Sequence, residues 1–160
     1  MKPEVVIRPA TPSDAASMLA QIHNSYENDL AHGTMIAIDD TATKPTIDAA
    51  ISGDGACAFV ADDENGKMVG FTLAFASPSL FNFSFLTVAP LFLWVATSSR
   101  GKGVGSKLTD ALIGWATDNK ASVFVLGNTK GHYDAAVGRI CKRRRFDFKE
   151  VTFFKKLGGA

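Results

Sequence analysis

One stretch of the chain combines small residues and positive charge at a spacing suited to binding an anion. Glycines stand at every second position of Gly101-Lys102-Gly103-Val104-Gly105, and Ser106 follows. Small residues allow backbone N–H groups to converge on an anion, and the first turn of a following helix adds the positive end of its dipole. Arg100, Lys102 and Lys107 bring fixed positive charge to the same segment. The stretch therefore predicts a site for a phosphate or a pyrophosphate.

Two familiar phosphate-binding loops do not fit this spacing. A Walker A loop ends in Gly-Lys followed by Ser or Thr, and the stretch contains no such triplet. A dinucleotide-binding fingerprint requires G-x-G-x-x-G, whereas the third glycine here comes one residue early, at Gly105. The phosphate site therefore belongs to neither of these classes.

The elements around this loop form an alternating pattern of strands and helices. Strand-like segments lie at residues 5–8, 56–61, 68–76, 80–95, 123–126 and 151–155, and Asp62–Lys67 forms a hairpin turn. Helical patterns follow Thr11 or Ser13, continue over 24–31 and 45–52, and recur from Val104 and over 133–144. This order predicts an α/β fold with a mixed sheet and helices on both faces.

Length and composition limit the possible classes of protein. The 160 residues suit one domain, 1–160, and 46% apolar with 21% charged residues is typical of a folded globular chain. No apolar run is long enough to span a membrane and the N-terminal residues form no signal segment, so we expect a cytoplasmic protein. Cys57 and Cys141 form neither a disulfide framework nor a metal-binding spacing, so we expect reduced, structural cysteines and no metal.

The charge is divided unevenly between the two parts of the chain. Residues 1–97 hold 4 Lys and Arg against 11 Asp and Glu, which gives −7, whereas residues 98–160 hold 13 against 5, which gives +8. The sum of −7 and +8 is the net charge of +1. Such a division suggests that one part handles an anion while the other tolerates a cation. A chance distribution of surface charge is the alternative.

The loop also matches the pattern Arg-x-x-Gly-x-Gly, filled by Arg100, Gly103 and Gly105. With this pattern and the order of elements, the chain resembles the GNAT superfamily of acyl-CoA-dependent N-acyltransferases. The opening Ile7–Asp14, the two strands in Gly55–Ala74 and the closing Arg143–Phe146 are similar to that family, so the resemblance spans nearly the whole chain. It implies a single-domain, mostly antiparallel sheet flanked by helices.

The resemblance also implies a cofactor and a reaction. Acetyl-CoA would donate an acetyl group by direct attack of a small amine or a peptide amine on the thioester. Backbone N–H groups of the loop, which comprises Arg100, Gly101, Lys102, Gly103, Val104, Gly105 and Ser106, would hold the pyrophosphate. The pantetheine arm would run beside the strand ending at Val95, and an N–H near Trp94 or Val95 would stabilise the tetrahedral oxyanion.

The groups for proton transfer are harder to assign. An alkylamine with a pKa of about 10.4 is almost entirely protonated at neutral pH, so a base is useful. In many family members a Tyr five residues before the Phe of a Gly-Phe pair protonates the leaving thiolate; here that Tyr position holds Cys141, and Arg145 precedes Phe146 in place of the glycine. Cys141 or Tyr133 is a candidate acid, unless no acid is used.

The strand before the loop contains no carboxylate or histidine, so the general base must come from another part of the chain. Glu27 and His132 are the strongest candidates. His132 follows the strand over 123–126 by a few residues and would reach the cleft, whereas Glu27, Asp29 and His32 lie in the region that lines the acceptor site in this family. Each of these side chains is alternatively a solvated surface group.

Two features remain without an assigned role. The basic run Lys142–Arg145 suits a solvated helix end, a nucleic-acid-linked acceptor, or the 3′-phosphate of CoA. Phe81, Phe83 and Phe85 alternate with polar residues and so share one strand face; we expect them to pack in the core, whereas exposed rings would indicate a homodimer. A catalytically weak acyl-CoA-binding module is the alternative to an enzyme, since the usual tyrosine is missing.

Overall fold

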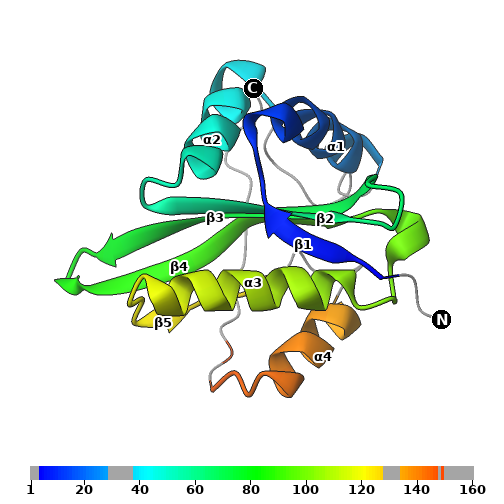
Figure 1. Cartoon of the computed structure of the whole chain (residues 1–160). Coiled ribbons are helices and arrows are strands. Elements are labelled where there is room, and N and C mark those ends of the chain that lie inside the picture. The colour runs from blue at the N-terminus through cyan, green and yellow to red at the C-terminus, as the bar shows by residue number, and fades with distance from the viewer. Residues whose placement is uncertain (1–3, 29–37, 128–133, 148, 150–160) are drawn as a thin grey trace, which may run out of the picture.

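The fold is a five-stranded sheet with helices on both faces (Figure 1). The computed structural model describes residues 4–28, 38–127, 134–147 and 149. The strands lie in the order β1-β2-β3-β4-β5, of which the first four are antiparallel and β5 is parallel to β4. Their bounds are β1 Val6–Pro9, β2 Ala56–Asp62, β3 Met68–Ser79, β4 Asn82–Val95 and β5 Val123–Phe124. The predicted mixed, mostly antiparallel sheet is confirmed.

Helices cover the two faces in pairs. Helices α1 (Ala15–Asn28) and α2 (Asp40–Ser52) lie above the sheet in Figure 1, whereas α3 (Val104–Asp118) and α4 (Asp134–Arg143) lie below it. Two short 3-10 turns, η1 (Pro12–Asp14) and η2 (Thr97–Ser99), precede α1 and the glycine loop. This arrangement confirms helices on both faces, as the order of elements predicted.

Some predicted boundaries are wrong. Helix α2 begins at Asp40 rather than at Pro45, because Asp39 caps it by accepting a hydrogen bond from the Thr41 N–H at 2.9 Å. No separate helix starts at Asn24, because α1 runs unbroken to Asn28. Strand β5 spans two residues instead of the four expected. The expected strand over residues 151–155 lies outside the described residues.

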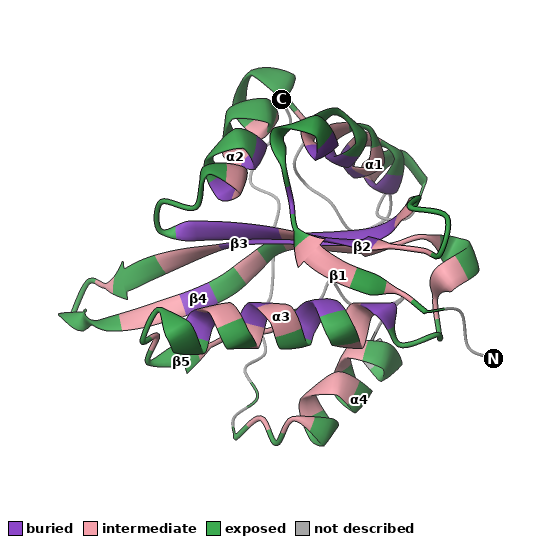
Figure 2. Ribbon diagram, viewed as in Figure 1, coloured by how far each residue is buried: buried purple, intermediate pink, exposed green. Residues whose placement is uncertain are grey.

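The two faces of the sheet have separate cores, coloured purple in Figure 2. Met18 and Ile47 pack with Phe71 beneath α1 and α2. On the opposite face Val104 and Leu108 of α3 pack against the sheet. Alternating side chains therefore anchor both helix layers on the same strands.

Helix α3 lies unusually close to β3, at Gly70. A Cβ on Gly70 would lie 3.0 Å from the Val104 Cγ1 atom and 3.0 Å from the Trp94 carbonyl oxygen, tighter than ordinary contact. The missing side chain therefore lets the first turn of α3 approach the sheet, and that turn carries the glycine-rich loop.

The expectation that Phe81, Phe83 and Phe85 pack in the core is wrong. Phe81 is fully exposed, Phe83 is 77% exposed and Phe85 is 40% exposed. These residues lie at the end of the β3–β4 hairpin, which extends beyond the neighbouring strands, so no helix covers them in the described part of the chain (Figure 1).

An ion-pair network fixes β1 to the start of α1. The Arg8 guanidinium donates to both carboxylate oxygens of Asp14, at 2.8 and 3.0 Å, and to Asp62 at 2.7 Å. Asp14 also accepts hydrogen bonds from the N–H and the hydroxyl of Thr11, at 2.8 and 2.9 Å. The hydrogen bonds from Arg8, with those from Thr11, lower the pKa of Asp14 from 3.8 to about 2, against the opposing effect of burial.

We expect Asp14→Asn to lower the free energy of unfolding at neutral pH by about 1–2 kcal/mol, because it removes a charged partner of the partly exposed Arg8. Since the folded-state pKa of Asp14 lies below its ordinary value, its contribution is complete above pH 3.8 and is lost as the pH falls through about 2. Urea unfolding at several pH values should therefore show the two proteins converging only below about pH 4.

Asp48→Asn is the matched control, since Asp48 pairs with Lys44 at 2.8 Å on the exposed face of α2. It should change the free energy of unfolding by no more than about 0.5 kcal/mol. Equal losses in the two variants would show that the Arg8 network is no stronger than a surface pair.

Candidate functional site: a glycine loop beside an open strand edge

Strand β4 keeps one neighbour along its whole length and loses the other. Its parallel ladder with β5 consists of Thr87 opposite Val123 and Val88 opposite Phe124. Beyond Val88, no strand of the described part of the chain pairs with this side of β4. We call this side of residues 89–95 the open edge.

A β-bulge marks the point of divergence. Leu73 opposes Phe92 and Ala74 opposes Pro90, so Leu91 is an extra residue in β4. A bulge bends its strand and increases the local twist, and a proline cannot donate a ladder hydrogen bond. Both effects turn the end of β4 away from β5.

The direction of the β4 backbone determines which groups face the open edge. The Ala96 N–H donates to the Val69 carbonyl at 2.9 Å, so the backbone of Ala96 faces β3. Since successive N–H groups of a strand point in opposite directions, the Trp94 N–H also faces β3, whereas those of Leu93 and Val95 face the open edge. Of the two predicted oxyanion donors, only Val95 therefore has its N–H on this edge, and Leu93 joins it.

The predicted phosphate loop follows directly after the open edge. Gly101 and Gly103 have φ angles of +75° and +89°, a region that favours glycine, and Gly103 caps α3. The Lys107 N–H donates to the Gly103 carbonyl at 3.0 Å, so the N–H groups of Val104, Gly105 and Ser106 precede the helical hydrogen bonds. These donors at a helix N-terminus suit an anion, as the sequence predicted.

Two contacts adjust that prediction. The Arg100 N–H donates to the Thr97 carbonyl at 3.3 Å, so the set of available loop N–H groups begins at Gly101. The Lys107 ammonium donates to the Val5 carbonyl at 3.0 Å, which ties α3 to the chain before β1. Lys107 therefore has a structural contact in addition to its charge.

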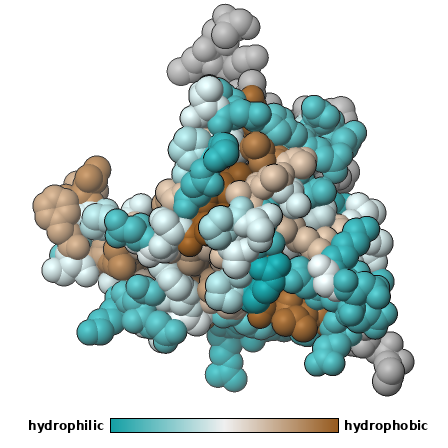
Figure 3. Space-filling view, turned by 45° about the horizontal axis from the view of Figure 1, so that its top comes forward, coloured by the Kyte–Doolittle hydropathy of each residue, from teal (hydrophilic) through white to brown (hydrophobic). Residues whose placement is uncertain are grey.

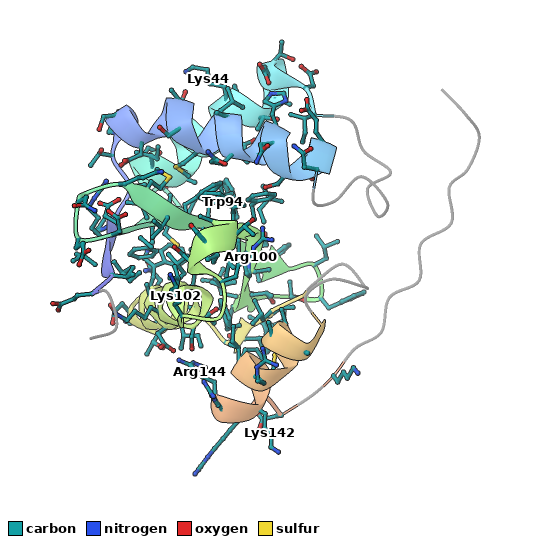
Figure 4. All side chains as sticks on the ribbon, turned by 90° about the vertical axis from the view of Figure 1, so that its right-hand side faces the viewer. Lys44, Trp94, Arg100, Lys102, Lys142 and Arg144 are labelled. Carbon is teal, nitrogen blue, oxygen red and sulfur yellow. The ribbon has the colours of Figure 1, made fainter. Side chains whose placement is uncertain are left out.

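The end of the loop lies beside the side chains at the end of β4. A Cβ on Gly105 would lie 3.7 Å from the Val95 Cγ2 atom and 3.8 Å from the Leu93 Cδ2 atom. The Arg100 guanidinium donates from Nε to the Val95 carbonyl at 3.0 Å, while Lys102 is exposed on the loop (Figure 4). An extended ligand could thus bind with its anionic group on the loop and the rest of its length beside β4.

A row of aromatic rings lies on the other face of β4. Tyr26 of α1 stacks on Phe92, with ring centroids 6.3 Å apart, and Phe92 stacks on Phe71 at 5.6 Å. Trp94 continues the row, 5.8 Å from Phe71, and points into the core beneath α1 (Figure 4). The Trp94 side chain is therefore a core group, although the sequence placed Trp94 in the cofactor site.

The row places the end of α1 beside the bulge. Glu27, one of the two predicted bases, follows Tyr26 and is exposed at the end of α1. Sequence reasoning missed Tyr26, although it lies four residues after Ile22 and so continues the apolar stripe of α1. It also missed the contact of His23 Nε2 with Asp40 Oδ1, 2.5 Å apart, which joins α1 to α2.

The remaining candidate acids and bases are only partly placed. Cys141 is half-buried on α4, and its carbonyl accepts a hydrogen bond from the Phe146 N–H at 3.1 Å. His132 and Tyr133 lie outside the described residues, as do Asp29 and His32. Cys57 is buried, and desolvation raises its thiol pKa from 9.0 to about 12, which suits a structural cysteine.

The basic run contributes to the attachment of α4. The Arg144 guanidinium pairs with the Asp110 carboxylate of α3, with Nε 2.6 Å from Oδ1. This contact raises the pKa of Arg144 and holds the end of α4 against α3. Lys142, Arg143 and Arg145 are exposed at the helix end, where cations suit the helix dipole. Arg144 therefore has a structural partner within the chain.

Among residues 4–28, 38–127, 134–147 and 149, no group of three or more His, Cys, Asp or Glu side chains is arranged to hold a metal ion. None of the helices in this part of the chain has the length and hydropathy of a membrane span.

The fold and the site together define an α/β protein that presents a phosphate-type loop next to an open strand edge. Residues 19–138 match the model of the acetyltransferase (GNAT) family. The chain therefore belongs to this family of acetyltransferases, which confirms the resemblance and the class of enzyme predicted from the sequence. No curated protein matches the chain significantly.

Solved structures share the fold at low sequence identity. The aminoglycoside N-acetyltransferase AAC(6′)-Iy, in complex with a bisubstrate analogue, is 17% identical with a TM-score of 0.71, over 97% of this chain and 99% of that one. A predicted acetyltransferase from Clostridium acetobutylicum with acetyl-CoA is 18% identical with a TM-score of 0.70, over 97% and 96%. Glucosamine-6-phosphate N-acetyltransferase from Arabidopsis thaliana is 15% identical with a TM-score of 0.67, over 97% and 99%.

The glycine loop generates a direct test. Gly103→Ala places a side chain at a φ of +89°, so we expect the loop to distort and the dissociation constant for CoA to rise at least about tenfold, with a loss of stability of about 1 kcal/mol. Isothermal calorimetry with CoA and urea unfolding would measure the two effects.

Gly114→Ala is the control in the same helix, because nothing lies within 4 Å of a Cβ at that position. This variant should bind CoA as the wild type does and should be more stable by about 0.5–1 kcal/mol. Unchanged CoA affinity in Gly103→Ala would contradict the assignment of the loop.

Proposed function

We propose that the chain acetylates a primary amine of a small cationic molecule, with Gly101–Ser106 and the open edge of β4 holding acetyl-CoA. The observation that carries this proposal is the position of the loop at the end of β4, since Gly105 lies beside the side chains of Leu93 and Val95, whose N–H groups face the open edge. A pyrophosphate on the loop would leave the pantetheine arm beside the backbone of β4. The amide groups of the pantetheine arm could then form hydrogen bonds with the backbone groups of β4 that β5 does not pair.

The N–H groups facing the open edge supply the electrostatic part of catalysis. The N–H of Val95 is nearer the loop and suits the amides of the pantetheine arm. That of Leu93 lies farther along β4, toward the bulge, and suits the thioester oxygen. As the amine nitrogen attacks the carbonyl carbon, negative charge develops on that oxygen, and a fixed N–H stabilises it.

The reaction is completed by breaking the C–S bond and removing a proton from nitrogen. The electron pair of the C–S bond leaves with the CoA sulfur as a thiolate, which accepts a proton from Cys141, Tyr133 or water. A thiol with a pKa of about 8.5 is a fair leaving group, so this acid is helpful rather than essential. The amine proton passes to Glu27 or His132, directly or through water.

The end of α1 supports a cationic acceptor. The Tyr26 ring lies over Phe92 beside the bulge, and an aromatic face attracts an ammonium group. Glu27 adds negative charge next to it, within the part of the chain that carries a net −7. The aminoglycoside and glucosamine-6-phosphate enzymes that share the fold also act on small amines, which favours a small amine over a peptide amine.

A cytoplasmic location stays a prediction of the sequence.

A panel of amines with acetyl-CoA, followed by release of the CoA thiol, tests this proposal. We expect turnover with polycationic small amines, and Glu27→Gln should raise the KM for the amine about tenfold while leaving the KM for acetyl-CoA unchanged. Glu64→Gln, in the exposed β2–β3 turn, is the matched control and should change neither constant.

The same measurement separates the two candidate bases. Loss of the acidic limb, where the rate rises with pH, in the pH–rate profile of Glu27→Gln or His132→Gln would identify the base, and unchanged profiles in both would contradict the assignment. CoA binding without turnover of any amine would favour the alternative of an acyl-CoA-binding module.

A further inference from the structure

The β3–β4 hairpin extends beyond the rest of the sheet as a two-stranded arm (Figure 1). The β2 ladder ends with Ala56 opposite Phe75, whereas β3 and β4 stay paired as far as Ser79 opposite Asn82. The register shifts between Pro78 and Ser79, because Pro78 opposes Leu86, so residues 83–85 have no partner in β3. On the other side, contact with the segment before β5 ends at Leu86, whose carbonyl accepts from the Ser122 N–H at 2.8 Å. Residues 77–85, which we call the arm, therefore have no neighbouring strand among the described residues.

The arm carries an apolar surface in place of the polar turn usual for a hairpin. Leu80 is 87% exposed, and the neighbouring Phe81, Phe83 and Phe85 are exposed as described above. Figure 3 shows apolar side chains projecting at the left of the molecule, where the arm ends in Figure 1. Single exposed apolar residues are common on proteins, but four together at one tip indicate a contact surface.

The arm is also free of charge. No Asp, Glu, Lys, Arg or His occurs between Lys67 and Arg100, so every residue of the arm and of the strands leading to it is neutral. A neutral apolar patch is complementary to itself, because two copies bring no like charges together and desolvate none. A surface that binds anionic lipid would instead carry Lys or Arg beside its apolar residues.

We propose that the arm joins two copies of this chain in an isologous homodimer, with the exposed phenylalanine rings packed against their counterparts. In such a two-fold contact the same patch serves both subunits. Since an aromatic side chain buries about 150–250 Å², the four tip residues of each copy offer roughly 500 Å², and two copies bury about 1,000 Å². That area lies near the lower limit of specific interfaces, so the dissociation constant should be micromolar.

The contact uses side-chain faces rather than added strands. The Ser84 N–H donates to the Asn82 side-chain oxygen at 3.1 Å, and the Phe81 N–H donates to the Ser79 hydroxyl at 3.2 Å. Because these side chains already satisfy the backbone donors, the edge offers less to an incoming strand. Phe81 and Phe83 are the most exposed rings of the arm and form the centre of the proposed contact.

Sedimentation velocity of the full chain from about 1 to 200 µM tests this inference, since that range spans a micromolar equilibrium. We expect a monomer–dimer equilibrium in the wild type and a monomer at every concentration for the double variant Phe81→Ser, Phe83→Ser. The exposure of both rings makes the variant fold normally, which circular dichroism would verify. Its turnover per subunit at low concentration should match that of the wild type, so the readout is independent of the proposed function.

Val6→Ser is the control, because Val6 is an exposed apolar residue of β1, away from the arm, with 56% of its surface accessible. It should dimerise as the wild type does. A wild-type monomer throughout the range, or a dimer that persists in the double variant, would overturn the proposal. So would a monomer that pellets with neutral or anionic phospholipid vesicles, which would assign the arm to a membrane surface.

Discussion

The separation of β4 from β5 is the constraint on which the rest of the site depends. Two pairs of residues hold the strands together, and the bulge at Leu91 then turns β4 away. The buried Thr72 hydroxyl, which donates to the Phe92 carbonyl at 2.8 Å, holds the strand to β3 just past the bulge. A regular ladder would consume the N–H groups that face outward. Divergence instead keeps them available at the point where a glycine-rich helix N-terminus supplies further donors.

The alternation of side chains along β4 gives the strand two structural roles in addition to its chemical one. Phe92 and Trp94 join the core beneath α1 and α2, while Leu93 and Val95 pack toward α3. The strand end is thereby fixed from both faces, although one of its edges lacks a strand partner in the described part of the chain. Catalysis by backbone groups needs such rigidity, because preorganised donors stabilise a transition state only when they do not move with the reaction.

Sequence reasoning was most successful where a local pattern has a local cause. The glycine loop, the helix from Val104 and the order of the elements along the chain follow from spacing and turn residues, and the family match confirms the class they indicated. The phenylalanine stripe shows the limit: alternation shows that the rings share a face, but not whether anything covers that face. Tyr26 on Phe92 and Arg144 on Asp110 are contacts between distant segments, for which the sequence carries no local signal. The predicted helix over 45–52 begins too late, because the cap is Asp39 and the helix starts at Asp40.

The burial of Cys57 makes the two thiols of the chain chemically unequal. With its pKa near 12 and its side chain in the core between the sheet and α3, Cys57 has almost no thiolate at neutral pH. Alkylating and disulfide reagents react through the thiolate, so modification of the folded protein should concentrate on the half-buried Cys141. A single fluorophore or spin label attached to the Cys141 thiol would then report on α4, the helix that Arg144 holds against α3.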